Sequence, residues 1–407
     1  MKIETGLLAE AGVLQDTVVA LRRRLHRHPE LGLELPKTQA AVVDALADVP
    51  GLAISTGSSL SSVIGVLDGD LPGPTLLLRA DMDALPLQEE TAVEFASTVP
   101  GAMHACGHDA HTAMLVGGAH LLSAHRSTLA GRVIFMFQPG EEGFDGARRM
   151  LDEGLLDSNG PVDRACAVHV DPLAPAGTVA TRGGTIQASG DQFGVTVRGR
   201  GGHAARPHDA IDPIPVACEI VLALQSMLTR RVSVFDPVVL TIGRVTAGAS
   251  FGIIPAEAVL EGTIRAMSEE SRQVAVAGLR RVAEGVAAAH LCTAEVTELT
   301  TPFPVSVNDV DVSEQALAVA VALLGSDHVM RLPNPIMPAD DWGHVLHRVP
   351  GVKVLLGVRP PELARPEPNH SSRMVIDESA LTVGTAFNAA MALDGTSAHR
   401  EPIGRVR

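Results

Sequence analysis

The chain has 407 residues, more than one ordinary hydrophobic core accommodates, so two domains are expected. Hydrophobic residues make up 46% and charged residues 19%, which is typical of soluble globular proteins. A formal net charge of −15 and an aromatic content of only 2% argue against nucleic-acid binding. No apolar run approaches the roughly 18 residues of a membrane span, and the N-terminal MKIETGLLAEAGVLQD lacks a secretory pattern. We therefore expect a cytoplasmic protein whose partners include neither a membrane nor a nucleic acid.

The first elements along the chain predict an α/β domain. Helical spacing of apolar side chains over residues 10–28 predicts an early helix, with the arginines at 22–24 on its solvated face. Apolar runs of strand length, typical of strands buried on both faces of a mostly parallel sheet, cover residues 61–67, 75–80, 132–137, 164–170 and 352–358. Helices are expected between them at 112–125 and 146–156. The pattern predicts a mostly parallel sheet with helices on both faces.

The middle of the chain follows a different pattern. Its expected order is strand, helix, strand, strand, helix, strand, at residues 193–200, 212–231, 237–245, 257–266, 268–290 and 294–300. That order is typical of a ferredoxin-like α+β domain. Segments rich in Gly or Pro, at 177–190 and 300–305, are suitable hinges on either side. We expect a lid or dimerisation domain at 186–304, inserted into a catalytic domain formed by 1–185 and 305–407.

The four cysteines are far apart and show no paired spacing, so a disulfide framework is not expected. Cys166, Cys218 and Cys292 stand in apolar surroundings and are predicted to be buried free thiols. Cys106 differs because Gly107 and histidines flank it in the segment HACGHDAH, residues 104–111.

Polar side chains gather at the expected ends of strands. Asp81 and Asp83 follow one strand, QPGEEG at 138–143 follows another, His169 lies at the end of a third, and His370 lies in the loop after 352–358. In open α/β sheets, ligand sites form beyond the carboxyl ends of the strands, so these groups can converge.

A helix is expected to start just after HACGHDAH, with Asp109 as its N-cap. Cys106 and His108 would then lie on the preceding loop, two residues apart and able to face the same way.

Together these groups suggest a metal site. A lone histidine is usually structural, but the combined set offers sulfur, nitrogen and oxygen donors suited to zinc-like ions, namely Cys106, His108, Glu142, His169 and His370. With Asp81 and Asp83 added, there are more than four donors, which suggests two ions. A structural zinc site would be local and Cys-rich, whereas these candidates span more than half the chain. A nucleophilic Cys106 would leave the Glu-Glu and Asp-x-Asp turns unexplained.

Several motifs resemble the amidohydrolase branch of the dinuclear metallopeptidase and aminoacylase family, which includes hippurate hydrolases, N-acyl-amino-acid amidohydrolases and auxin-conjugate hydrolases. These motifs are LHRHPELGLE (25–34), RADMDALP (79–86), HACGHDAH, QPGEEG, AVHV (167–170), RGGHAARPH (200–208) and GTIR (262–265). The resemblance extends from about residue 20 to about residue 390. It implies a two-domain enzyme whose inserted ferredoxin-like lid can mediate a homodimer.

The resemblance also implies roles for individual residues. Two divalent ions, zinc, manganese or cobalt, are expected as cofactors, held by Cys106 as a bridge together with His108, Glu142, His169 and His370. Glu141 matches the general base, and Asp83 matches the aspartate that orients a metal-bound histidine. His203 matches a substrate-binding or transition-state-binding histidine of the lid, and Arg265 is expected to bind the substrate's carboxylate.

The sequence departs from the family pattern at three places. Gly252 replaces the asparagine of the lid motif Asn-x-Ile-Pro, Asp340-Asp341-Trp342 replaces Glu-Asp-Phe, and Ser372 replaces the proline of His-Ser-Pro. The expected metal set is intact, so these changes affect the substrate rather than the reaction.

The resulting hypothesis is a metal-dependent hydrolase of N-acyl amino acids, small molecules whose amide bond would be cleaved to a carboxylic acid and a free amino acid. A dipeptidase or carboxypeptidase on the same fold is an alternative. A metal-retaining binding protein without turnover is another, but it would have no need of the base Glu141 beside a ligand glutamate.

Overall fold

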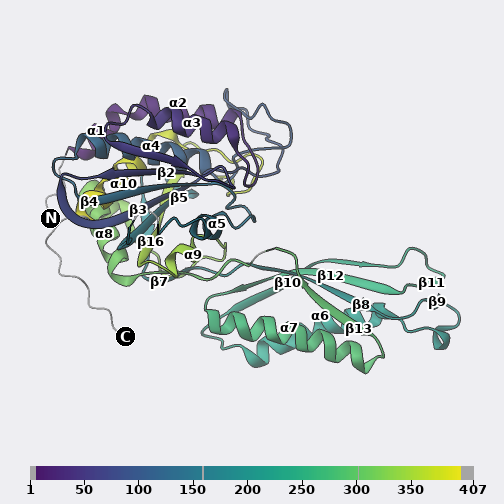
Figure 1. Cartoon of the computed structure of the whole chain (residues 1–407). Coiled ribbons are helices and arrows are strands. Elements are labelled where there is room, and N and C mark those ends of the chain that lie inside the picture. The colour runs from purple at the N-terminus through teal and green to yellow at the C-terminus, as the bar shows by residue number, and fades with distance from the viewer. Residues whose placement is uncertain (1–5, 158–159, 301, 396–407) are drawn as a thin grey trace. The chain divides into compact units, whose positions relative to one another are not determined.

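A computed structural model describes residues 6–157, 160–300 and 302–395 of the chain (Figure 1). The chain divides into two compact units. The second unit contains Gln187–Ser306 together with the segment Pro335–Gly343, and the first contains the remaining described residues.

The first unit is built on an eight-stranded sheet with the order β1-β2-β4-β3-β5-β16-β6-β15. The strands are β1 (Leu52–Thr56), β2 (Val63–Asp68), β3 (Leu71–Asp81), β4 (Ala130–Gln138), β5 (Arg164–Pro175), β6 (Val179–Thr181), β15 (Val329–Arg331) and β16 (Gly351–Arg359). The central strands β4, β3, β5 and β16 pair in parallel, whereas β1 and β2 add an antiparallel edge. The predicted mostly parallel sheet is confirmed.

Helices cover this sheet on both sides. They are α1 (Leu7–Val13), α2 (Gln15–Arg27), α3 (Pro36–Leu46), α4 (His108–Ala124), α5 (Gly146–Asp152), α8 (Val310–Leu324), α9 (Gly343–Leu346) and α10 (Leu381–Gly395), with short 3₁₀ turns at Ser326–His328 and Glu378–Ala380. Figure 1 shows α2, α3, α4 and α10 on one side of the sheet and α9 on the other, and α8 packs against α10 in the same core as α4. Nearly every residue of α4 is buried, because this helix packs between the sheet and its neighbours α2 and α10. Helix α4 therefore brings its first turn into the interior of the unit.

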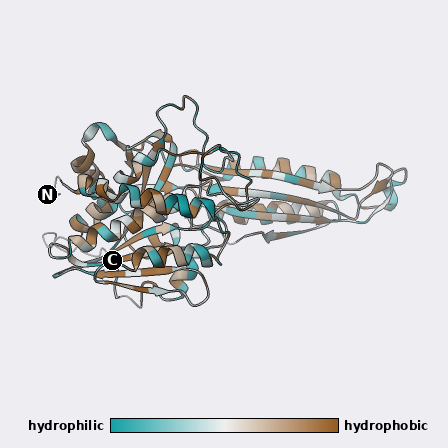
Figure 2. Cartoon of the chain, turned by 90° about the horizontal axis from the view of Figure 1, so that it is seen from above, coloured by the Kyte–Doolittle hydropathy of each residue, from teal (hydrophilic) through white to brown (hydrophobic). Residues whose placement is uncertain are grey.

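The second unit has the predicted ferredoxin-like order. Its elements are β8 (Asp191–Arg198), α6 (Pro213–Arg231), β10 (Val238–Ala247), β12 (Glu257–Ala266), α7 (Glu269–Ala289) and β13 (Thr293–Glu298). The strands form an antiparallel sheet in the order β10-β12-β8-β13. Figure 2 shows hydrophobic and hydrophilic residues alternating along both helices, as expected for helices with one face on a sheet.

Shorter elements complete the fold. β9 (Gly202–His203) pairs with β11 (Ile253–Ile254), β7 (Gly184–Gln187) pairs with β14 (Ser306–Asn308), and a 3₁₀ turn covers Pro207–Asp209. Within the described residues, none of the helices combines the length and apolar character that crossing a membrane would need.

Three expectations about single residues were wrong. Arg22 is buried rather than solvated, because it forms ion pairs with Asp109 and Glu378. Asp109 is not the N-cap of the helix, since α4 begins at His108 with Gly107 as its N-cap. Cys218 is exposed rather than buried, because it lies on the solvent-facing side of α6.

Candidate metal and catalytic site

The site forms where the central strands of the first unit end. Asp81 is the last residue of β3, and the segment QPGEEG starts at Gln138, the last residue of β4. β5 continues to Pro175, so His169 lies within this strand and pairs with Leu355 of β16. Because β3, β4 and β5 are parallel neighbours, the residues at these positions meet at one edge of the sheet.

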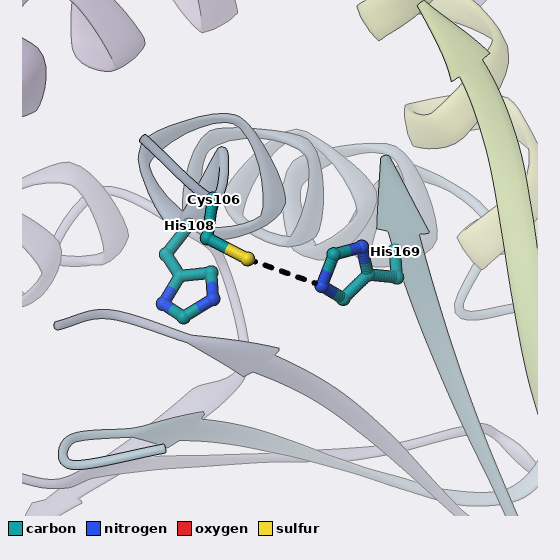
Figure 3. A group of neighbouring side chains, drawn as sticks. All are labelled: Cys106, His108 and His169. Carbon is teal, nitrogen blue, oxygen red and sulfur yellow. Dashed lines mark hydrogen bonds between the residues drawn. The ribbon is translucent and has the colours of Figure 1, made fainter. Parts of the chain in front are cut away.

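Gly107 allows the HACGHDAH segment to fit against β5. Its φ of +85° lies in the left-handed region, and a Cβ at this position would collide with the side chain of Val170. The turn places Cys106 just before α4 and His108 at its first position (Figure 3). The Sγ atom of Cys106 points to His169 and lies 3.6 Å from its Nε2 atom (Figure 3).

Backbone carbonyls orient the two histidines of this group. His108 Nδ1 donates to the carbonyl oxygen of Asp83 at 2.8 Å, and His169 Nδ1 donates to the carbonyl oxygen of Val170 at 2.9 Å. Because a carbonyl oxygen can only accept, both Nδ1 atoms carry a proton, and Nε2 is the atom of each neutral ring that can bind a metal. His108 Nε2 is also buried with no hydrogen-bond partner among the described residues, as expected for an atom that binds a metal.

Asp83 holds the two adjacent glutamates. Its carboxylate accepts the backbone N–H of Glu141 at 2.9 Å and that of Glu142 at 3.0 Å. Glu141 Oε2 lies 3.9 Å and Glu142 Oε1 4.0 Å from His108 Nε2. The carboxylate of Asp83 therefore positions the turn that carries both glutamates. Its backbone carbonyl accepts the hydrogen bond from His108 Nδ1. Burial raises the pKa of the Asp83 carboxyl.

His370 completes the set. Its Nε2 lies 3.2 Å from Glu142 Oε1, although the angle is not that of a hydrogen bond. Its backbone N–H donates to the carbonyl oxygen of Ala105 at 2.7 Å, so the loop after β16 lies against the Cys106 turn. The neighbouring Cys106 and Glu142 raise the pKa of His370 to about 10.

The structure brings together all five predicted metal ligands. Cys106, His108 and His169 form one group with ligand atoms within 4.8 Å of one another, and Cys106, Glu142 and His370 form a second. Cys106 belongs to both groups, the arrangement needed for a bridging ligand. The mixture of sulfur, nitrogen and oxygen donors suits zinc-like ions.

Asp81 and His111 lie beside this set, and His111 had no role in the sequence analysis. His111 Nδ1 donates to Asp81 at 2.5 Å, and its Nε2 accepts the backbone N–H of Val170 at 2.8 Å. Burial would raise the pKa of Asp81, but Arg79 and the nearby histidines outweigh it and hold this pKa well below its usual range. His111 therefore connects the end of β3 to β5, the strand that bears His169.

A buried ionic network behind α4 was also missed. Asp109 accepts from Arg22 Nε at 2.9 Å and from His26 Nδ1 at 2.8 Å, and His26 Nε2 lies 3.3 Å from Glu89. The one available signal was the spacing of Arg22 and His26, which places them on the same face of α2. The network fixes the start of α4, and hence His108, to α2.

The two predicted lid residues both lie in the second unit. His203, on β9, is exposed, and its Nδ1 accepts the backbone N–H of Ala205 at 3.0 Å. Arg265 lies near the far end of β12, whose first residue, Glu257, pairs with Arg198 shortly before β9. At 3.3 Å per residue, the eight steps from Glu257 to Arg265 separate the two ends of this strand by roughly 26 Å. His203 and Arg265 are therefore at opposite ends of the lid sheet.

Hydrolysis assisted by a metal requires donors for the ion and a carboxylate that can accept a proton from the attacking water. The first unit supplies both at one sheet edge, and the second unit has a ferredoxin-like fold. The protein is a metal-dependent amidohydrolase. Comparison with known proteins defines its family more closely: residues 77–394 match the model of peptidase family M20/M25/M40, and the chain belongs to this family.

Individual relatives resemble nearly the whole chain. An N-acetylcysteine deacetylase from Bacillus subtilis is 38% identical, over 92% of this chain and 96% of its own length. Thermostable carboxypeptidase 2 from Saccharolobus solfataricus is 36% identical, over 93% of this chain and 95% of its own length. The crystal structure of the Bacillus subtilis YXEP protein, described as a dinuclear metal-binding peptidase of the M20 family, superimposes with a TM-score of 0.80. It is 34% identical and covers 95% of this chain and 99% of that one.

Proposed function

We propose that the protein hydrolyses N-acyl amino acids with two divalent metal ions held by Cys106, His108, Glu142, His169 and His370. The observation that carries the proposal is the double donor group that shares Cys106, with Glu141 beside it. When bound, the ions supply the Lewis acidity that lowers the pKa of a water molecule and polarises the amide carbonyl. The sulfur and nitrogen donors favour zinc or cobalt, and manganese is the further candidate.

Glu141 is the proposed general base. It would accept the proton of the attacking water and deliver it to the leaving amine, while Glu142 serves as a ligand. Asp83 would hold both glutamates in register through the two backbone hydrogen bonds described above. His108 and His169 would keep their Nε2 atoms directed at the ions because carbonyls hold their Nδ1 protons.

Arg265 is the proposed binding group for the substrate's carboxylate. The acid whose charge acts on Arg265 is Asp191, and its two oxygens already accept from Arg272 at 2.8 and 2.9 Å. Desolvation lowers the pKa of Arg265, and among the described residues only the charge of Asp191 counteracts this. A partly buried guanidinium without its own carboxylate can bind an anion through two parallel hydrogen bonds.

His203 is the second proposed lid residue, with a role in binding the substrate or transition state. Because it lies at the opposite end of the lid sheet from Arg265, one copy of the lid cannot place both residues on one small substrate. A homodimer formed through the lid would resolve this, since one copy could supply Arg265 and the other His203. We also propose that the enzyme acts in the cytoplasm, where a thiol ligand such as Cys106 stays reduced.

A carboxypeptidase is the second candidate, because one 36% identical relative is named a carboxypeptidase. A hydrolysis screen separates the two. Purified protein loaded with zinc, manganese or cobalt is offered acetyl, benzoyl and long-chain acyl amino acids beside dipeptides and longer peptides. Faster release of amino acid from the acyl substrates supports the proposal, whereas faster cleavage of peptides supports the carboxypeptidase.

A further inference from the structure

The backbone of Val170 forms hydrogen bonds with three side chains around the site, those of His111, His169 and Asn369. Its backbone N–H donates to His111 Nε2 at 2.8 Å. Its carbonyl oxygen accepts from His169 Nδ1 at 2.9 Å and from Asn369 Nδ2 at 3.5 Å. The carbonyl that orients one proposed ligand is therefore also contacted by a side chain from the loop after β16.

The same amide of Asn369 reaches a second proposed ligand. Asn369 Nδ2 lies 3.7 Å from the Sγ atom of Cys106, within the range of an N–H···S hydrogen bond. Cys106 Sγ lies in turn 3.6 Å from His169 Nε2. One amide group thus contacts both the sulfur that belongs to the two donor groups and the carbonyl that fixes the ring of His169.

The orientation of Asn369 follows from its surroundings. Its Nδ2 faces a carbonyl oxygen and a sulfur, both of which accept hydrogen bonds, whereas its Oδ1 is buried with no hydrogen-bond partner among the described residues. The reverse orientation would place Oδ1 against both acceptors. The side chain is therefore held by its donor end, and the loop is pinned next to it by the bond from His370 N–H to Ala105 O at 2.7 Å.

We propose that Asn369 is a positioning residue that tunes the thiolate of Cys106 and fixes His169 through the Val170 carbonyl. An N–H donor withdraws electron density from a thiolate ligand, and hydrogen bonds around the ligands change metal affinity by about 10–100-fold. This inference rests on the proposed function, because it requires Cys106 and His169 to be ligands.

The test uses cobalt, whose bond to a thiolate gives a charge-transfer band in the near ultraviolet. The full chain is loaded with Co²⁺ as wild type, as Cys106→Ser, as Asn369→Leu, which keeps the side-chain size but has no donor, and as the control Ser371→Ala. Ser371 lies in the same loop, but its Oγ donates to Glu367 at 2.8 Å and forms no hydrogen bond with a proposed ligand in the described part of the chain. The melting temperature of each metal-free variant is measured, and Asn369→Ala replaces Asn369→Leu if the latter does not fold.

The expected results are specific to the amide. Asn369→Leu shifts the band to longer wavelength and weakens Co²⁺ binding, measured by competition with a chelator, by tenfold or more, whereas Ser371→Ala changes neither. The metal-free melting temperature of Asn369→Leu stays close to that of wild type. If the band and the Co²⁺ affinity of Asn369→Leu were unchanged, the inference about Asn369 would be overturned, while the proposed ligand set would stand. A wild-type protein without a band that depends on Cys106 would overturn the proposed ligand set as well.

Discussion

At the scale of single residues, the site depends on two adjacent glutamates with different tasks. Glu141→Gln is expected to lose about 10²–10⁴-fold in turnover, the usual effect of removing a general base, while it retains its metal. Glu142→Gln is expected to lose metal occupancy, because an amide is a poorer ligand than a carboxylate. Metal analysis beside kinetics distinguishes the two variants, and the reverse pattern would exchange their roles.

His26 gives the protein a predictable dependence on pH. Burial and Arg22 would lower its pKa, but Asp109 and Glu89 outweigh them and raise it to about 9. His104 also lies near, with its ring centroid 6.2 Å from that of His26, and burial lowers the pKa of His104 to about 3, so it adds no charge near neutral pH.

Because the folded pKa of His26 lies above the ordinary value of 6.5, its stabilising effect is fully present below pH 6.5 and is lost as the pH rises through about 9. A shift of this size corresponds to roughly 3 kcal/mol. We expect wild type to lose more thermal stability between pH 6 and pH 10 than His26→Gln does. If the melting temperatures of the two proteins fell by the same amount over this pH range, His26 would not be charged.

Residues whose burial depends on partners distant in sequence were the hardest to predict. The five proposed ligands and Glu141 were identified because their motifs are local. Arg22 was misplaced because an arginine run usually faces solvent, and its partners Asp109 and Glu378 are distant in sequence. Cys218 was misplaced because its apolar neighbours in sequence say nothing about which side of α6 it occupies.

At the scale of elements, the first turn of α4 determines the geometry of the site. The sequence predicted a helix here, but its start was placed too late, because Asp109 looked like a cap and instead forms buried ion pairs. Gly107 is the residue that allows the early start.

Gly107→Ala is expected to destabilise the protein and weaken metal binding. The matched control is Gly101→Ala, since Gly101 also has a positive φ, of +73°, but a Cβ there would meet nothing within 4 Å. Both variants carry the left-handed strain of about 1–2 kcal/mol, and only Gly107→Ala adds the collision with Val170. Thermal melting and chelator competition check the difference, and equal losses in both variants would contradict a role for close packing against β5.

At the scale of the whole molecule, the order of elements was predictable because each of the two patterns has its own periodicity. Apolar runs indicated the parallel strands, and the strand–helix order indicated the lid. The opposite positions of His203 and Arg265 were not predictable, since the sequence predicted the lid strands but not how they pair or that Gly202–His203 pairs with Ile253–Ile254. The proposed roles of His203 and Arg265 therefore depend on their positions in the folded domain, which the sequence did not show.

The lid is expected to recognise the carboxylate of the substrate, which an acidic protein would otherwise repel. Converting an N-acyl amino acid to its amide should lower kcat/KM by tenfold or more, in line with about 1.5–3 kcal/mol for a charged hydrogen bond. Arg265→Ala should lose this preference. Arg244→Ala, which removes an exposed lid arginine paired with Glu261, should keep it. Equal rates for acid and amide in wild type would indicate a broader amidase.

The central claim is that two metal ions and Glu141, and not a cysteine nucleophile, carry the hydrolysis of N-acyl amino acids. The most direct measurement is a titration of the chelated, metal-free protein with zinc, manganese or cobalt, following release of the free amino acid. We predict no turnover without metal and a rise that levels off at two equivalents. Full activity of the metal-free protein, or an acyl group trapped on Cys106 in that form, would contradict the claim.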